Sequence, residues 1–142
     1  MKKILILLLI VSASLTAYGQ RGLHIDQLFQ GRIIPQERMV ETKVRGKMVA
    51  KYQLSYFHSL RFEATASEVK RIEELLDKDR QTSYQRVESK KALTIMLQLQ
   101  PQASLNRYLC FKRTGNGKHM QVVVIYMEGT LSSLDKMNEL LK

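Results

Sequence analysis

Alternation of large aliphatic residues with mostly polar ones is the feature that most constrains what this chain can fold into. In residues 92–99, leucine or isoleucine occupies every second position, which is the period of a strand with one buried face. The same period recurs in residues 40–45 and 52–63, and residues 122–127 are almost continuously apolar, as in a central strand covered on both faces. Short turns connect most of these segments, so we expect a mainly antiparallel sheet.

Two longer segments have the period of an amphipathic helix. The first begins at Thr65, where Glu68 three residues later completes a capping box before an apolar stripe. The second follows Ser132 and Asp135, which form the same capping pattern near the end of the chain. Residues 23–31 predict a further short helix that ends at a glycine.

Together these elements predict an α+β fold: a mainly antiparallel sheet of about five strands, with the two amphipathic helices packed on one face and a short N-terminal helix. The polar segment 81–91 is interpreted as a connection with weak strand potential near Tyr84, and Pro101 is expected to end the strand before it. The strand over residues 52–63 is long, so we expect a bend or bulge within it. Because no linker-like stretch is visible further along the chain, we expect one domain over residues 20–142.

The beginning of the chain has the layout of a bacterial secretory signal peptide. Two lysines precede a short aliphatic run, and the small residues Ala17 and Gly19 stand before a cut at Gln20. The aliphatic run is too short for a membrane-spanning helix, which needs about 20 apolar residues. We therefore predict a signal peptide over residues 1–19, cleaved after Gly19, and a mature chain in the periplasm or outside the cell. The alternative is an uncleaved N-terminal anchor.

The chain is strongly basic, with 23 lysines and arginines against 13 aspartates and glutamates. Loss of Lys2 and Lys3 with the signal peptide lowers the formal net charge from +10 to about +8. Basic proteins often bind nucleic acid, but export argues against that partner. We expect instead an envelope protein, an acidic glycan or an anionic lipid. The alternative is that the charge only keeps the domain soluble.

Four basic side chains flank a glycine-containing turn at residues 114–117, which we expect to join two antiparallel strands. The turn lacks the spacing of a phosphate-binding loop, and it precedes a strand rather than a helix. Its cationic tip is nevertheless the best sequence candidate for contact with an anion. The residues of this predicted anion-binding or partner-binding tip are Lys112, Arg113, Lys118 and His119.

Three aromatic residues lie close together in the strand-like segment 52–63. Tyr52, Tyr56 and Phe57 could form an aromatic platform for a sugar or a peptide, and packing in the core is the alternative for such rings. The chain contains no tryptophan, which weakens the sugar version of this prediction.

The sequence contains no recognisable catalytic or metal-binding motif. Cys110 is the only cysteine, and none of the three histidines stands at a family spacing from it or at the spacing of a zinc site. The acidic residues at positions 73, 74, 77 and 79 are interleaved with the basic residues at positions 70, 71, 78 and 80, as on a solvated helix face with ion pairs. We therefore assign no catalytic residue, no metal ligand and no cofactor.

Three segments carry a resemblance that spans most of the chain. They are the N-terminal MKKILILLLIVSASLTAYGQ, the helical ASEVKRIEELL, and the closing VVVIYMEGTLSSLDKMNELL, in which Glu-Gly and a turn separate a strand from a helix. The chain resembles small exported proteins of Bacteroidota that belong to families of unknown function. The resemblance implies export and a small α+β domain, and it brings no catalytic residues.

The function that these observations favour is a non-enzymatic binding or accessory protein of the cell envelope that contacts an anionic partner. One alternative is a small hydrolase or transferase with a site around His58 or Cys110, which requires a pocket at one of these side chains. The other is a carrier that holds an apolar ligand between sheet and helices, which requires an unfilled apolar cavity.

Overall fold

The structure, a computed structural model, describes residues 22–81 and 83–140, so the predicted signal peptide lies outside the described residues. Strands predominate in this part of the chain. The elements in chain order are α2 (Asp26–Phe29), the 3-10 helix η1 (Gln36–Arg38), β1 (Val40–Arg45), α3 (Lys47–Ala50), β2 (Leu54–Thr65), α4 (Ala66–Asp79), β3 (Tyr84–Glu88), β4 (Ala92–Gln102), β5 (Leu105–Thr114), β6 (His119–Gly129) and α5 (Leu134–Leu140).

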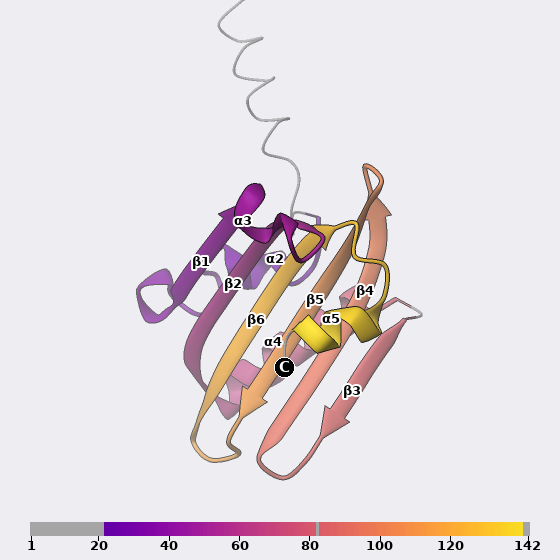
Figure 1. Cartoon of the computed structure of the whole chain (residues 1–142). Helices are drawn as coiled ribbons and strands as arrows, with labels where there is room; N and C mark the ends of the chain where they lie inside the picture. Colours follow the sequence, from indigo (N-terminus) through magenta and orange to yellow (C-terminus); the bar gives the residue numbers. More distant parts are fainter. Residues whose placement is uncertain (1–21, 82, 141–142) are drawn as a thin grey trace, which may run out of the picture.

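The strands form one six-stranded antiparallel sheet in the order β1-β2-β6-β5-β4-β3 (Figure 1). The prediction of about five strands is wrong, because the segment interpreted as a connection contains the edge strand β3. This strand pairs with β4, from Tyr84 opposite Leu97 to Glu88 opposite Leu93. An edge strand has one hydrogen-bonded neighbour and tolerates polar and charged side chains, so it shows little of the apolar periodicity of an inner strand.

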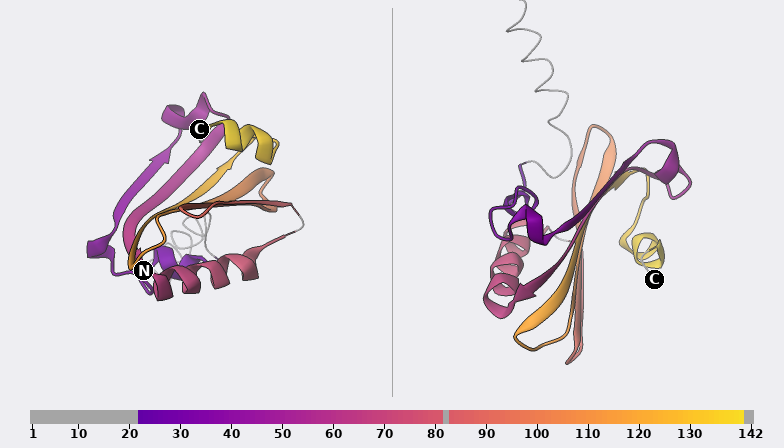
Figure 2. Two further views of the ribbon diagram at one scale, coloured as in Figure 1. Left: turned by 90° about the horizontal axis from the view of Figure 1, so that it is seen from below. Right: turned by 90° about the vertical axis from the view of Figure 1, so that its left-hand side faces the viewer.

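Helices lie against both faces of the sheet (Figure 2). We call the face that packs against α4 and α2 the α4 face, and the face that packs against α5 the α5 face. The α4 face carries the larger apolar cluster, in which Ile72 and Leu76 of α4 lie among strand residues such as Leu60 and Val124. The smaller cluster on the α5 face consists of Val49, Leu54, Met96, Tyr108, Cys110, Ile125, Met127, Leu131, Leu134 and Met137.

The prediction of two amphipathic helices on one face is therefore wrong. The reason lies in β6, whose apolar run is buried on both sides. Val124 and Tyr126 belong to the cluster on the α4 face, whereas Ile125 and Met127 belong to the cluster on the α5 face. A strand that is apolar on both sides needs cover on both faces of the sheet, and α5 supplies part of the second cover. The fold is thus mostly β, with α4 and α5 on opposite faces.

Helix α4 begins as the sequence predicts. The Thr65 hydroxyl accepts a hydrogen bond from the backbone N–H of Glu68 at 3.3 Å, and the Glu68 carboxylate accepts one from the backbone N–H of Thr65 at 3.0 Å. This capping box satisfies backbone donors that the first helical turn leaves unpaired. Val69, Ile72 and Leu76 then pack into the cluster on the α4 face.

The end of α4 holds the N-terminal segment in place. The Asp79 carboxylate accepts hydrogen bonds from the backbone N–H groups of His24 and Ile25, both at 2.7 Å. Asp79 is only 4% exposed, so its interpretation as part of a solvated helix face is wrong. Because these N–H groups precede α2, the contact fixes α2 over the sheet. There the Phe29 ring lies 4.6 Å from the ring of His58, measured between centroids.

Between β1 and β2 the chain forms the short helix α3, where the sequence predicts only a turn. The pairing of β2 with β6 shifts between Leu54 and Tyr56, which confirms the predicted irregularity in this long strand. Leu54 and Phe57 consequently pack on the α5 face, whereas Tyr56 belongs to the cluster on the α4 face. The edge strand β1 is more exposed than its alternation predicts, and its Val40 is 66% exposed.

Strand β4 continues past Pro101 to Gln102, so the prediction that this proline ends the strand is wrong. The pairing of β4 with β5 is irregular between Leu99 and Gln102, which accommodates a residue that has no backbone N–H to donate. The chain then reverses through Ala103 and Ser104, which have positive φ angles of 52° and 66°.

The predicted capping of α5 is shifted by one residue. The backbone N–H of Lys136 donates a hydrogen bond to the Ser133 hydroxyl at 3.2 Å. The hydroxyl of Ser132, the predicted cap, instead lies 3.4 Å from the Lys136 ammonium. The apolar periodicity predicts a stripe of Leu134, Met137, Leu140 and Leu141 on this helix. Leu134 and Met137 are buried as predicted, Leu140 is 38% exposed, and Leu141 lies outside the described residues.

Candidate functional site

An apolar groove of about 320 Å³ opens on the α5 face, where α3 meets β1, β2, β6 and the end of α5. Figure 2 shows α3 and α5 projecting from the same side of the sheet. The side chains that line the groove are almost entirely hydrocarbon or aromatic. They are Val44, Val49, Tyr52, Leu54, Phe57, Met127 and Leu140.

Large apolar side chains of this groove remain open to solvent. Tyr52 is 42% exposed and Leu140 is 38% exposed. Among the described residues, the other exposed large hydrophobic side chains are those of Val40, Val87 and Tyr84. Strand pairing places Val40 and Val87 on the α5 face as well, and Tyr84 on the α4 face. Val40 and Val87 lie on the two opposite edge strands of the sheet, whereas Tyr52 and Leu140 both line the groove. Contiguous exposed apolar surface such as that of the groove indicates a binding surface.

A more polar hollow of about 300 Å³ adjoins the groove and shares the side chains of Tyr52 and Leu140 with it. The charged side chains of this polar hollow are Lys51, Lys136 and Glu139. The Tyr52 side chain separates the two spaces, and the Lys51 ammonium lies 4.9 Å from the centre of its ring. The positive charge of Lys51 is therefore close to the end of the apolar groove. In the part of the chain that the structure describes, the apolar groove therefore ends beside two lysine ammonium groups and one carboxylate.

Hydrogen bonds hold the walls of the groove in place. The Gln53 carbonyl oxygen accepts from the backbone N–H groups of Thr130 and Leu131, at 2.9 and 3.1 Å, which fixes the end of β6 against the start of β2. The Leu131 carbonyl oxygen accepts from the buried Tyr108 hydroxyl and from the Asn106 side chain. A groove on such a frame is formed before a ligand arrives, which lowers the entropic cost of binding.

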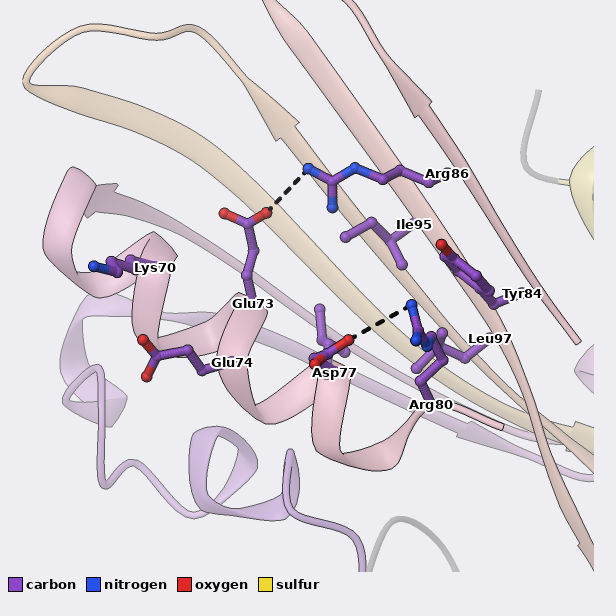
Figure 3. A pocket seen from close by; sticks show the side chains of 10 residues that line it. Lys70, Glu73, Glu74, Asp77, Arg80, Tyr84, Arg86, Ile95 and Leu97 are labelled. Atoms are coloured by element: carbon purple, nitrogen blue, oxygen red, sulfur yellow. Dashed lines mark ion pairs between the residues drawn. The ribbon is translucent and has the colours of Figure 1, made fainter. Parts of the chain in front are cut away.

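A second pocket lies on the α4 face, between α4 and the strands β3 and β4 (Figure 3). It has a volume of about 350 Å³, and its apolar lining consists of Leu76, Ile95 and Leu97. The polar and charged side chains around this lining are Lys70, Glu73, Glu74, Asp77, Arg80, Tyr84 and Arg86.

Many charges of this second pocket already neutralise one another. Glu73 pairs with Arg86 at 3.6 Å, and Asp77 pairs with Arg80 at 3.7 Å, as Figure 3 shows. The Arg80 guanidinium also lies over the Tyr84 ring, 4.6 Å from its centre. A charged ligand in this pocket would replace these ion pairs with similar ones. Because each exposed ion pair contributes only about 0–1 kcal/mol, the replacement gains little binding free energy. Binding in the apolar groove provides more free energy, because covering apolar surface contributes about 25 cal/mol per Å².

The structure distributes the predicted cationic tip over both faces of the sheet. Lys112 and Arg113 are successive residues of β5, so their side chains point to opposite faces. Arg113 lies on the α4 face, 3.9 Å from the Met120 sulfur. Lys118 is exposed before β6, and the exposed His119 lies 3.6 Å from a Glu63 carboxylate oxygen. Anion binding by these residues stays a prediction.

The predicted aromatic platform is also divided between the two faces. Tyr52 and Phe57 line the apolar groove. Tyr56 lies on the α4 face and is only 5% exposed, with the Arg45 guanidinium 4.0 Å from the centre of its ring. The structure therefore brings two of the three residues together, and they meet in a groove rather than on a flat platform.

His58 and Cys110, on which the catalytic alternative depends, are both buried. Cys110 belongs to the cluster on the α5 face, and burial raises the pKa of its thiol to about 11, which makes it a poor nucleophile near neutral pH. Burial lowers the pKa of His58, whose Nε2 lies 3.3 Å from the Glu41 carboxylate. Neither side chain lines the groove, the polar hollow or the pocket beside α4.

Sequence patterns also miss a buried polar network on the α4 face. The Tyr126 hydroxyl donates a hydrogen bond to the Glu128 carboxylate at 2.7 Å and accepts one from the Arg107 guanidinium at 2.8 Å. Arg107 and Glu128 are cross-strand partners on β5 and β6, and both are buried. The Tyr126 hydroxyl thus bridges two opposite charges between central strands, which we interpret as a structural role.

The remaining groove residues, Val44, Val49, Leu54, Met127 and Leu140, are not singled out by the sequence, because each belongs to an apolar pattern that predicts core packing. The groove remains because the last helix covers little of its face. The described part of this helix, Leu134–Leu140, spans about 10 Å. A six-stranded sheet is about 24 Å wide. The last helix can therefore cover only part of its face.

Within the described part of the chain, the helices are too short or too polar to cross a membrane. In the same residues, the His, Cys, Asp and Glu side chains form no group of three or more that could hold a metal ion.

The model of a family of unknown function, DUF6108, matches residues 12–141 of the chain. The chain belongs to this family. No curated protein and no solved structure matches it. Membership in DUF6108 confirms the resemblance to a family of unknown function, and origin in Bacteroidota stays a prediction. In this DUF6108 member, the apolar groove is therefore the candidate functional site.

Proposed function

We propose that this protein is an exported, non-enzymatic binding protein whose apolar groove holds the hydrocarbon part of a ligand. The observation that carries the proposal is a groove of about 320 Å³ lined by apolar side chains, with Tyr52 and Leu140 left open to solvent. Ligand pockets are typically about 300 Å³ or larger and mostly apolar, with a few polar groups that orient the ligand. The groove and the adjoining polar hollow fit that description.

The chemistry of the buried side chains supports binding rather than catalysis. A nucleophile or a general base has to reach a substrate, at about 3 Å in the reacting complex. Cys110 and His58 are 1% and 2% exposed, and the groove is lined by side chains that neither donate nor accept protons, with the exception of Tyr52. A hydrolase or transferase built on Cys110 or His58 therefore has little support.

Export is part of the same proposal, and it rests on the signal-peptide layout of residues 1–19. Outside the cytoplasm, the apolar compounds available to a groove are chiefly those of the cell envelope. Mass spectrometry of the protein recovered from a secreting cell is expected to show Gln20 as the first residue. A secreted chain that still begins at Met1 would contradict cleavage.

Titration of the purified protein with N-phenyl-1-naphthylamine tests ligand binding. This dye is uncharged and fluoresces more strongly in apolar surroundings. We expect a saturable rise in fluorescence with one site per chain and a dissociation constant of about 10–100 µM, as for a small apolar ligand of this size. A signal that rises linearly without saturation would contradict the proposal.

A further inference from the structure

We infer that the ligand of the groove is a single-chain amphiphile with an anionic head group, of the chemical class of a fatty acid. Its hydrocarbon chain lies in the apolar groove, and its head group lies in the polar hollow near Lys51 and Lys136. The inference deepens the proposed function and rests on it, because it names the ligand class of the same groove.

The first support is the continuity of the two spaces. Tyr52 and Leu140 line both the apolar groove and the polar hollow. A ligand that passes these two side chains therefore moves from hydrocarbon surroundings to charged ones within one molecule's length. A wholly apolar ligand would make no use of the charged end, and a wholly polar one would leave the groove uncovered.

The second support is the charge at that end. Among the described residues, the polar hollow contains the cations Lys51 and Lys136 and the carboxylate of Glu139. Lys51 is placed at the shared wall by its contact with the Tyr52 ring, and the Lys136 ammonium is 3.4 Å from the Ser132 hydroxyl. Asp135, on the same helix, accepts from the Gln85 side chain on β3 instead. The excess of positive charge favours an anionic head group.

The third support is size. A groove of about 320 Å³ has the size of a small ligand site, since ligand pockets are typically about 300 Å³ or larger, and suits a hydrocarbon chain of medium length. A folded protein partner fits less well, because only a small set of described side chains, seven in number, lines the groove. A stable protein interface involves about 20–30 residues on each side.

Displacement of the bound dye by three matched ligands tests the inference. Decanoate, decanol and decyltrimethylammonium carry the same ten-carbon chain with a negative, neutral or positive head group. We expect decanoate to displace the dye at the lowest concentration and the cation to require the highest. Lys51→Gln and Lys136→Gln should each weaken decanoate binding about two- to fivefold and leave decanol unchanged, since an exposed ion pair is lost. Glu139→Gln should strengthen decanoate binding.

Lys90→Gln is the matched control, because Lys90 is an exposed lysine in the turn between β3 and β4. This variant should bind decanoate and decanol as tightly as the wild-type protein does. Equal displacement by the three ligands would contradict the anionic head group, and so would lysine variants that bind decanoate as tightly as the wild type. Either result would leave the groove as the site of the hydrocarbon chain. If none of the three displaces a dye that does bind, the occupant is not a single-chain amphiphile. Failure of the dye itself to bind would instead overturn the proposed function.

Discussion

Gly129 packs directly against the backbone at Gln53. A Cβ atom at position 129 would lie 2.6 Å from the Cα atom of Leu54, closer than real contacts allow. This approach lets the Gln53 carbonyl oxygen accept hydrogen bonds from the two N–H groups that follow β6. The glycine lines no part of the groove, yet it sets the distance between β2 and the segment that leads into α5.

Replacement of Gly129 by alanine is expected to lower the free energy of unfolding by about 1–3 kcal/mol, because the methyl group must push two backbone segments apart. Urea denaturation followed by circular dichroism measures the change. Gly117→Ala is the control, since a Cβ atom there meets open space, and its effect should stay within about 0.5 kcal/mol. Equal stability of the two variants would show that the close approach does not exist.

Loss of the Tyr126 hydroxyl should destabilise the fold without changing its shape. Tyr126→Phe removes the bridge between Arg107 and Glu128 and leaves both charged groups buried with fewer partners, at an expected cost of about 2–4 kcal/mol. The midpoint of urea unfolding reports this cost. Tyr84→Phe, at a ring that is 41% exposed, is expected to change stability by less than about 0.5 kcal/mol. Similar values for both variants would contradict the bridging role.

The Cys110 thiol should be almost unreactive in the folded protein. Burial raises its pKa to about 11, so at pH 8 about one thiol in a thousand is ionised, and the surrounding cluster also blocks the reagent. We expect iodoacetamide to label native protein at least about 100-fold more slowly than protein in urea. A Cys110→Ala protein with Ser132→Cys, at an exposed position, should react at the rate of an ordinary thiol. Rapid labelling of native Cys110 would contradict its burial.

Protonation of His58 should oppose folding. Burial lowers its pKa in the folded protein, with Lys43 adding to the effect and the carboxylates of Glu41 and Asp26 opposing it. The free energy of unfolding is then highest above the ordinary histidine pKa of about 6.5. It falls as the pH drops below that value, by up to about 2 kcal/mol at pH 5. Urea denaturation at pH 7 and pH 5 measures this fall.

Two histidine variants separate His58 from other titrating groups. His58→Gln should flatten the pH dependence, whereas His119→Gln should retain it, because His119 is exposed beside Glu63. An unchanged fall in the His58→Gln protein would assign the pH dependence to another group.

The parts of the fold that the sequence predicts correctly are those that depend on neighbours along the chain. The capping box of Thr65 and Glu68 forms as expected, because its hydrogen bonds join residues three positions apart. The irregularity near Leu54 follows from strand length. Residues near Tyr84 have only weak strand potential, and it is the pairing with β4 that makes them strand β3. The side on which α5 packs also depends on contacts across the sheet, and no local pattern encodes it.

The groove is harder to predict for the same reason. The residues Val44 and Met127 have the periodicity of core residues, and only the incomplete cover of the α5 face leaves them beside open space. The sequence singles out Tyr52, Tyr56 and Phe57 alike as a candidate platform. Tyr56 and Phe57 are successive residues of β2, so their side chains point to opposite faces of the sheet. Sequence patterns therefore indicate which side chains are apolar but not which of them stay uncovered.

Dye titration of two variants of β1 tests the groove most directly. Val44 lines the groove, whereas Val40, on the same face of the same edge strand, is 66% exposed and outside it. Circular dichroism confirms folding of both variants before titration with N-phenyl-1-naphthylamine. We predict that Val44→Trp weakens dye binding at least about tenfold, because the indole fills the groove, and that Val40→Trp leaves it unchanged. Equal binding by the two variants would contradict the groove as the ligand site.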